Sequence, residues 1–349
     1  MLEFAFTAFS GRLGNMPHTR LRHLQESFDR LIKFARIIGI LGHRQVGKTT
    51  FLKANARECV TLDDEDIFKT ASNSPKKFIE SLQANRSGID ECQLVPGLFS
   101  ALKVKIGTSS TPGRFILTGS VRFTSRKAIR ESLTGRISNL ELLPFCMTEI
   151  ENEPNSSLFL QMLTCESFEN MEHRFVIPSS LFNEHSNAIE RYLKNGGLPG
   201  LFHIRDERTR VSQLADILET ILDRDIRLVY KTSLPYLSDT RLDDSDWITL
   251  IYRNIRAQFQ YRIGERADFF HYKTRGGAMI PISIRTKKGY LGLIPILCKS
   301  EINLSLRRSA DSFLKHYGRS KVLFITRTGK ESEILNDRIA LVPAQVALF

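Results

Sequence analysis

Apolar residues recur along the first 150 residues in two alternating patterns. We predict an amphipathic helix over residues 21–34, where Leu21, Leu24, Phe28, Leu31 and Ile32 follow helical spacing. Strands are predicted at residues 36–41, 58–62, 114–118 and 137–145 and in the residues just before Asp90. A further helix is expected at residues 75–83, and a solvated acidic loop at 63–66. Five strands alternating with helices predict an α/β three-layer fold.

The rest of the chain changes from a helical to an alternating pattern. Residues 151–230 are predicted to be helical, and their clearest apolar face consists of Leu214, Ile217, Leu218, Ile221 and Leu222. A turn at residues 196–199 interrupts this region. Further on, strands are predicted at residues 271–274, 279–286, 292–299 and 321–327, with a helix at 305–317.

A phosphate-binding loop follows the first predicted strand. It consists of Gly42, His43, Arg44, Gln45, Val46, Gly47, Lys48, Thr49 and Thr50. Flanking glycines let backbone N–H groups turn inward around a phosphate, and the positive end of the following helix faces the same charge. Lys48 is expected to reach the β- and γ-phosphates and Thr49 to ligate Mg²⁺. ATP is therefore the predicted cofactor.

Two adjacent carboxylates end the third predicted strand. Asp90 is expected to hold Mg²⁺, and Glu91 to orient and deprotonate the attacking water. Strand periodicity places their side chains on opposite faces, so the pair can divide these roles. Residues 86–88 are polar or glycine where a buried central strand normally carries an apolar run, which weakens the strand assignment.

Charge adds one further expectation. The net charge of the 349 residues is +12, and residues 251–330 hold 17 Lys and Arg against 4 Asp and Glu. Such a concentrated basic region attracts nucleic acid through counterion release. The alternative is a solvated basic surface without a partner, because the aromatic residues of this region could equally be core. These are Phe269, Phe270, Tyr272 and Tyr290.

Other classes of site and location are not indicated. No apolar run approaches the length needed to span a bilayer, and Glu3 stands where a secretory signal has basic residues, so we expect no membrane association and a cytoplasmic location. The five cysteines and eight histidines are dispersed without metal-ligand spacing. We therefore predict neither a disulfide framework nor a transition-metal site.

The motifs of residues 20–226 resemble a family of bacterial and archaeal ATPases of the AAA+ superfamily. The resemblance rests, in order, on residues 42–50, 62–64, 89–93, 115–120, 132–136, 143–145 and 196–199. It implies a P-loop ATPase core at 20–150, a helical lid at 151–230 and, after a winged helix, a C-terminal α/β domain resembling PD-(D/E)xK nucleases. Here a linker at 231–245 stands in place of the winged helix, the nuclease-like domain covers 246–349, and residues 1–19 stay unassigned.

The resemblance also implies roles for individual residues. Thr118 and Ser120 match the end of the fourth strand, which senses the γ-phosphate, and a hydroxyl there can position water. Arg136 matches a Gly-Arg signature, and an arginine can neutralise charge on the γ-phosphate in the transition state. Whether Arg136 acts in its own chain, reaches a neighbouring subunit of a homo-oligomer or forms a structural salt bridge stays open.

The C-terminal domain lacks the acidic residues that nuclease activity requires. Met279, Pro281 and Leu297 occupy the positions of the three metal-binding acids, and only Lys299 matches. An alternative register uses Glu265 and Asp268, which precede the first strand. We therefore expect an ATPase that couples lid motion to a nucleic-acid or protein partner on an inactive nuclease-like domain. A nucleotide-gated binding protein without hydrolysis and an active DNA nuclease are the alternatives.

Overall fold

The computed structural model describes residues 20–108, 111–119, 135–225, 244–262, 264 and 266–349. The chain divides into two compact units, each discontinuous in sequence. Unit 1 comprises residues 1–145 and 198–203, and unit 2 comprises residues 146–197 and 204–349. Among the described residues, no helix combines the length and the apolar character that crossing a membrane requires.

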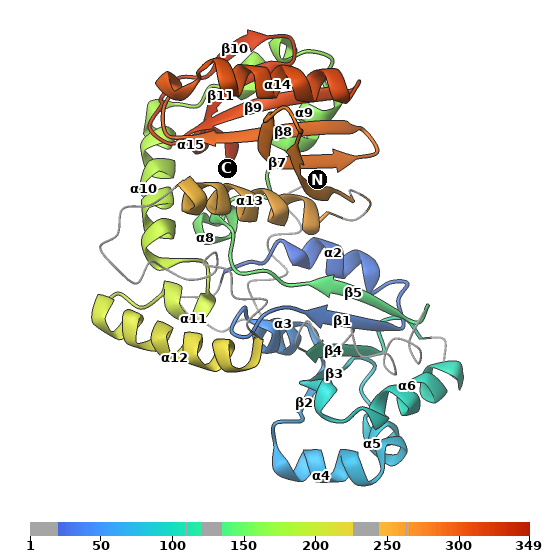
Figure 1. Ribbon diagram of the computed structural model, residues 1–349. Helices are drawn as coiled ribbons and strands as arrows, with labels where there is room; N and C mark the ends of the chain where they lie inside the picture. The colour runs from blue at the N-terminus through green and yellow to red at the C-terminus, as the bar shows by residue number, and fades with distance from the viewer. Residues whose placement is uncertain (1–19, 109–110, 120–134, 226–243, 263, 265) are drawn as a thin grey trace. The chain divides into compact units, whose positions relative to one another are not determined.

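Unit 1 is built on a five-stranded parallel sheet with the order β2-β3-β4-β1-β5 (Figure 1). The strands are β1 (Ile37–Leu41), β2 (Glu58–Thr61), β3 (Ser87–Asp90), β4 (Phe115–Gly119) and β5 (Ile137–Glu141). The helices are α2 (Leu24–Leu31), α3 (Lys48–Asn55), α4 (Glu65–Asn73), α5 (Pro75–Ser81), α6 (Gly97–Thr108) and α11 (Pro199–Phe202), with a 3-10 turn η1 (Cys92–Leu94). The predicted α/β arrangement with a parallel sheet is confirmed.

The two faces of this sheet are covered by different helices. Ile89 belongs to a buried cluster with Phe78 of α5 and Phe99 of α6. Gly88, its neighbour in β3, points to the other face, because successive strand residues alternate. An added Cβ at Gly88 would lie 2.8 Å from Leu52 Cδ1 of α3. The glycine that weakened the strand assignment is thus required by the close approach of α3.

Two predictions for unit 1 were wrong in detail. The fifth strand ends at Glu141 rather than continuing to residue 145, although Leu142 N still donates to Leu41 O at 2.7 Å. The acidic residues 63–66 are not a simple loop, because Asp64 caps α4. Its Oδ1 accepts from Asp66 N at 3.0 Å and Ile67 N at 3.1 Å, which satisfies amides that the helix itself leaves unpaired.

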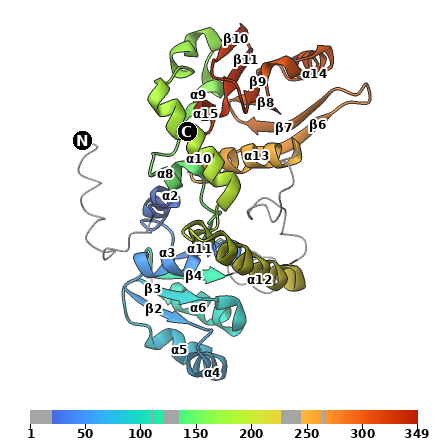
Figure 2. The same cartoon turned by 90° about the vertical axis from the view of Figure 1, so that its left-hand side faces the viewer.

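Unit 2 contains a six-stranded mixed sheet with the order β10-β11-β9-β8-β7-β6. The strands are β6 (Asp268–Lys273), β7 (Met279–Thr286), β8 (Gly289–Ile296), β9 (Ser320–Thr326), β10 (Glu333–Asn336) and β11 (Ile339–Pro343). The strands β8, β9 and β11 run parallel, whereas β6, β7 and β10 pair antiparallel with their neighbours. The β6–β7 hairpin is plain in Figure 2.

Helices from both sequence segments of unit 2 accompany this sheet. They are α8 (Met147–Glu151), α9 (Leu158–Thr164), α10 (Ser179–Asn195), α12 (Glu207–Asp225), α13 (Asp244–Gln260), α14 (Leu304–His316) and α15 (Ala344–Ala347), with 3-10 turns η3 (Phe168–Arg174) and η5 (Lys299–Glu301). Of these helices, α9, α13, α14 and α15 pack against strands of the sheet. A cluster on α14 and the sheet buries Phe313 with Phe324 and Ile294. Tyr272 belongs to this cluster, and Phe270 and Tyr290 pack against it, so these aromatic residues serve the core.

The segment predicted as one helical lid is helical but belongs to both units. Residues 198–203 fall in unit 1, and the other described residues of 151–230 fall in unit 2. Contacts distant in sequence hold the earlier part to the C-terminal sheet: Phe168 N donates to Asp337 O at 2.9 Å, and Lys321 Nζ to Cys165 O at 2.5 Å. Motion of the segment as a lid stays a prediction. Residues 1–19 and most of the predicted linker at 231–245 lie outside the described residues.

Candidate nucleotide-binding site

The loop between β1 and α3 has a backbone that only glycine accepts at two positions. A Cβ at Gly42 would lie 2.4 Å from Leu142 O, so the strand end packs too closely for a side chain. Gly47 has φ +95° and caps α3, and Gln45 also lies in the left-handed region with φ 62°. The loop therefore curls back over the first turn of α3, with no acidic residue in that turn to repel an anion.

Lys48 is the first residue of α3, and it is buried inside the loop. Its side chain is 6% exposed, and Nζ donates to His43 O at 2.8 Å. Burial lowers the pKa of Lys48 below its ordinary value of 10.5, and the nearby carboxylates of Glu91 and Asp90 partly oppose that shift. The amino group of Lys48 is thus buried at the start of α3, with the carboxylates of Asp90 and Glu91 nearby.

Asp90 collects three hydrogen bonds at the carboxyl edge of the sheet. Thr49 Oγ1 donates to Oδ2 at 2.5 Å, Thr118 Oγ1 donates to Oδ1, and Glu91 N donates to Oδ1 at 3.1 Å. The order β3-β4-β1 explains the convergence, because the carboxyl ends of adjacent parallel strands share one edge. Asp90 is 3% exposed, so its orientation is fixed by these donors.

Glu91 does not continue β3 as the strand periodicity implied. The strand ends at Asp90, and Glu91 has φ 51° and ψ 41°, in the left-handed region that residues other than glycine rarely adopt. The opposite-face argument for the pair was therefore wrong, since the chain turns between them. The half-buried carboxylate of Glu91 accepts a hydrogen bond from Gln93 Nε2. Strain of this kind is often kept where it serves a site.

Arg22 is a loop contact that the sequence reasoning missed. Its Nη1 donates to Val46 O at 2.8 Å, its Nη2 donates to Leu143 O, and its guanidinium lies 4.7 Å from the ring centroid of Phe145. One side chain thereby connects the loop with the segment after β5. Arg22 lies inside the helix predicted at residues 21–34, but the helix begins only at Leu24, and nothing in the sequence around Arg22 signals this role.

The turn at α11 also lies beside the loop. A Cβ at Gly47 would come 3.9 Å from Pro199 Cγ, and one at Gly200 would come 3.7 Å from Gln45 Oε1. The sequence identified this turn without indicating where it lies. Tertiary packing brings the turn to the loop, and no local sequence pattern predicts this proximity.

Arg136 does not join the loop of its own chain. It is exposed and immediately precedes β5, whose Ile137 pairs with Ile37 and whose Glu141 pairs with Leu41. The loop begins after Leu41, so the two lie at opposite edges of the sheet, about 16 Å apart along the strand at 3.3 Å per residue. No salt bridge joins Arg136 to another described residue. Ser120 lies outside the described residues.

The positions aligned with nuclease acids show no metal centre. Met279 is 43% exposed at the start of β7, and Lys299 forms an ion pair with Glu333. In the alternative register, Asp268 is bound by Arg285 Nη2 at 2.7 Å, and Glu265 is outside the described residues. Among the residues that the structure describes, no group of three or more His, Cys, Asp or Glu side chains could hold a metal ion.

Comparison with known proteins agrees with the loop geometry. Residues 35–151 match the model of a family described as an AAA domain. The chain is also 24% identical over 200 residues to uncharacterized proteins of Mycobacterium bovis and Mycobacterium tuberculosis. Each match covers 56% of this chain and 37% of the relative, so the chain spans little more than a third of these relatives. The family match supports assigning this part of the chain to the AAA-like P-loop ATPases.

Proposed function

We propose that the chain binds ATP with Mg²⁺ and hydrolyses it at the loop between β1 and α3. The observation that carries this proposal is the buried ammonium of Lys48 inside a glycine-shaped loop at a helix N-terminus. Burying a cation in this way is costly unless an anion completes the site. A triphosphate fits that requirement, since the loop amides and Lys48 would hold its β- and γ-phosphates.

The donor set beside the loop suits Mg²⁺. The hydroxyl of Thr49 and the carboxylate of Asp90 are hard oxygen ligands, and their oxygens already meet at 2.5 Å. We assign Thr49 and Asp90 as the residues that hold the ion, and Thr118 as the residue that orients Asp90. When bound, Mg²⁺ would neutralise charge on the phosphates.

Glu91 is the proposed base. It directly follows Asp90, and its carboxylate is oriented by Gln93 and lies close enough to Lys48 to affect the pKa of that lysine. In this role Glu91 orients the attacking water and accepts its proton. The hydrogen bond from Gln93 favours a second candidate, a nucleotide-gated binding protein, because it occupies one carboxylate oxygen and could hold the group inactive.

We further propose that Arg136 acts on the site of a neighbouring subunit in a homo-oligomer. Its position at the far edge of its own sheet argues against action within one chain. As an exposed cation it could stabilise charge on a phosphate in the transition state. Ser120, as a polar side chain after β4, is proposed to sense the γ-phosphate.

The C-terminal part of unit 2 is proposed as a nuclease-like domain that holds a nucleic-acid or protein partner without cleaving it. Its order α13-β6-β7-β8-α14-β9 supports this, since a helix, three antiparallel strands, a helix and a parallel strand follow in turn. The absence of acids at Met279, Pro281 and Leu297 supports the inactive state. Motion of the helices at 151–230 would couple the nucleotide site to that partner.

Phosphate release by the full chain with Mg²⁺ and ATP tests the proposal. Glu91→Gln should keep ATP affinity by calorimetry and lose turnover, whereas Glu80→Gln, an exposed control on α5, should change neither. Lys48→Ala should weaken ATP binding, because the phosphate charge loses its partner. ATP binding without phosphate release in the wild type would select the binding-protein candidate, and absence of binding would refute both.

A further inference from the structure

A basic pocket lies within unit 2, and none of its lining residues belongs to the candidate nucleotide-binding site. The cavity measures about 680 Å³. Its cationic residues are Lys287, Lys288, Arg319, Lys321 and Arg338. Glu166 is the only carboxylate among the lining residues, all of which the structure describes. The wall thus carries a surplus of four positive charges.

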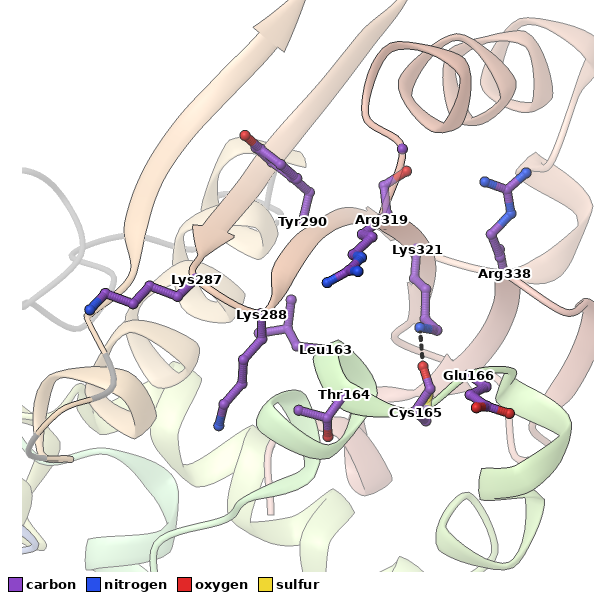
Figure 3. Close-up of a pocket in the computed structure, with 12 residues that line it drawn as sticks. Leu163, Thr164, Cys165, Glu166, Lys287, Lys288, Tyr290, Arg319, Lys321 and Arg338 are labelled. Atoms are coloured by element: carbon purple, nitrogen blue, oxygen red, sulfur yellow. Dashed lines mark hydrogen bonds between the residues drawn. The ribbon is translucent and has the colours of Figure 1, made fainter.

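The topology of the sheet explains why these residues meet. The neighbouring strands β8, β9 and β11 run parallel and therefore start at the same edge. Lys288, Arg319 and Arg338 each immediately precede one of these strands. Figure 3 shows Arg319 extending between Lys288 and Lys321 over the α9 segment. Residues distant in sequence thereby form one row of charge.

Three of the five cations of the pocket lie at the protein surface. Lys287, Lys288 and Arg319 are exposed, so binding would not require them to be uncovered. Lys321 is directed by its hydrogen bond to Cys165 O, a neutral acceptor that leaves its charge in place. The guanidinium of Arg338 lies 3.9 Å from a carboxylate oxygen of Asp337. Cations gathered at a concave surface repel one another and raise the local concentration of anions.

The arrangement fits a chain of phosphates better than a single phosphate. Three strands spaced about 4.8 Å apart spread Lys288, Arg319 and Arg338 over roughly 10 Å. That distance exceeds the size of one phosphate group and can accommodate a short run of consecutive phosphates of one strand. A flexible single strand can enter a cavity of this kind, whereas a duplex is a stiff rod that contacts outer surfaces.

We propose that this pocket binds the phosphate backbone of single-stranded nucleic acid. The proposal deepens the proposed function by naming the class of partner, and it places that partner at an unexpected edge of the sheet. Two of the positions aligned with nuclease acids lie toward the carboxyl end of β8: Leu297 directly follows that strand, and Met279 begins the antiparallel neighbour β7. The pocket lies at its beginning, eight residues or about 26 Å away along the strand.

Fluorescence anisotropy of a labelled oligothymidylate with the full chain, without ATP, tests the proposal. The double variant Lys288→Gln/Arg319→Gln should bind about fifteenfold more weakly near physiological salt, because two phosphate contacts are lost. Its plot of log affinity against log salt should be less steep by about 1.4, at 0.7 per contact for single strands. Arg338→Gln alone should lose about fourfold. The control Arg307→Gln/Arg308→Gln removes the same charge from exposed positions of α14 and should change affinity little.

Several results would overturn the proposal. Unchanged binding by Lys288→Gln/Arg319→Gln, or an equal loss in the α14 control, would mean that the pocket is not the site. Tighter binding of a duplex of the same sequence length would exclude the single-strand assignment. If inorganic triphosphate displaces the labelled oligonucleotide as effectively, per phosphate group, as an unlabelled oligonucleotide does, the pocket is a site for small anions. Calorimetry of ATP binding by the same variants separates the pocket proposal from the proposed ATP site. The ATP affinity of these variants should equal that of the wild type, whatever the anisotropy shows.

Discussion

Replacing Gly88 with alanine tests how closely α3 must pack against β3. The added Cβ would lie 2.8 Å from Leu52 Cδ1 and 2.9 Å from Ala56 Cβ. Leu52 is fully buried, and Ala56 Cβ has no torsion by which it could move away. The strand and the helix must therefore separate by several tenths of an ångström.

The magnitude follows from two opposing terms. Overpacking a filled interior costs about 1–3 kcal/mol. Alanine in place of glycine within a strand returns about 0.5–1 kcal/mol, since it restricts the unfolded chain. Taking the middle of each range, we expect Gly88→Ala to lower the free energy of unfolding of unit 1 by about 1 kcal/mol. Because α3 begins at Lys48, the same displacement should also weaken ATP binding.

Urea denaturation can assign the effect to unit 1. Trp247 is the only tryptophan of the chain and is buried in unit 2, so its fluorescence follows that unit, whereas circular dichroism follows both. Gly88→Ala should lower the dichroism midpoint and leave the fluorescence midpoint unchanged. The matched control is Gly107→Ala in α6, where no described atom beyond the chain neighbours and the backbone of the helix itself lies within 4 Å of the added Cβ, and a gain of up to about 1 kcal/mol is expected.

A double variant identifies the contact responsible. In the Leu52→Ala background the nearest obstacle is removed and Ala56 Cβ, 2.9 Å from the added Cβ, remains, so Gly88→Ala should cost less than it does in the wild type. If Gly88→Ala is as stable as the wild type, the packing argument is refuted, and an equal cost in both backgrounds would assign the obstacle to Ala56 rather than to Leu52.

Three further predictions concern the candidate site. Lys48→Met should be more stable than the wild type at neutral pH, because the wild type buries a charge there. Between the lowered pKa of Lys48 in the folded chain and 10.5, the unfolded wild type binds more protons than the folded one, so the wild type gains stability as pH rises and the advantage of Lys48→Met disappears. Denaturation at several pH values measures this difference. Arg22→Lys should reduce ATP affinity severalfold, because one ammonium nitrogen cannot reproduce the two separate guanidinium nitrogens that donate to Val46 O and Leu143 O; the exposed control Arg30→Lys should not, and equal calorimetric affinities would contradict the contact. Arg136→Ala should bind ATP without turnover, and mixing it with Lys48→Ala should restore phosphate release if the arginine acts between subunits; no recovery would indicate another role.

Much of unit 1 could be predicted because its signals are local. The loop is recognised from its glycines and Lys48, and the apolar strands from short buried runs. The capped helix after Asp64 was missed because the acidic cluster resembles a loop in composition. Arg22 and Pro199 were missed as neighbours of the loop because tertiary packing, and no local pattern, brings them there.

Unit 2 was harder to predict because its organisation depends on contacts distant in sequence. The strand at Met279–Thr286 was predicted with its observed bounds, and the helix at Leu304–His316 to within a residue. The C-terminal strands β10 and β11 and the helix α13 were not predicted. The basic residues of the pocket are dispersed along the chain, and only the parallel pairing of β8, β9 and β11 brings them together.

The path of the chain limits how this protein can be dissected. The backbone leaves unit 1 after Phe145, returns for residues 198–203 and then leaves again. A truncated ATPase fragment that ends at residue 145 would lack Pro199 and Gly200, which lie against Gly47 and Gln45. Weak nucleotide affinity in such a fragment would therefore reflect the loss of the residues that lie against the loop rather than an inability of the full chain to bind nucleotide.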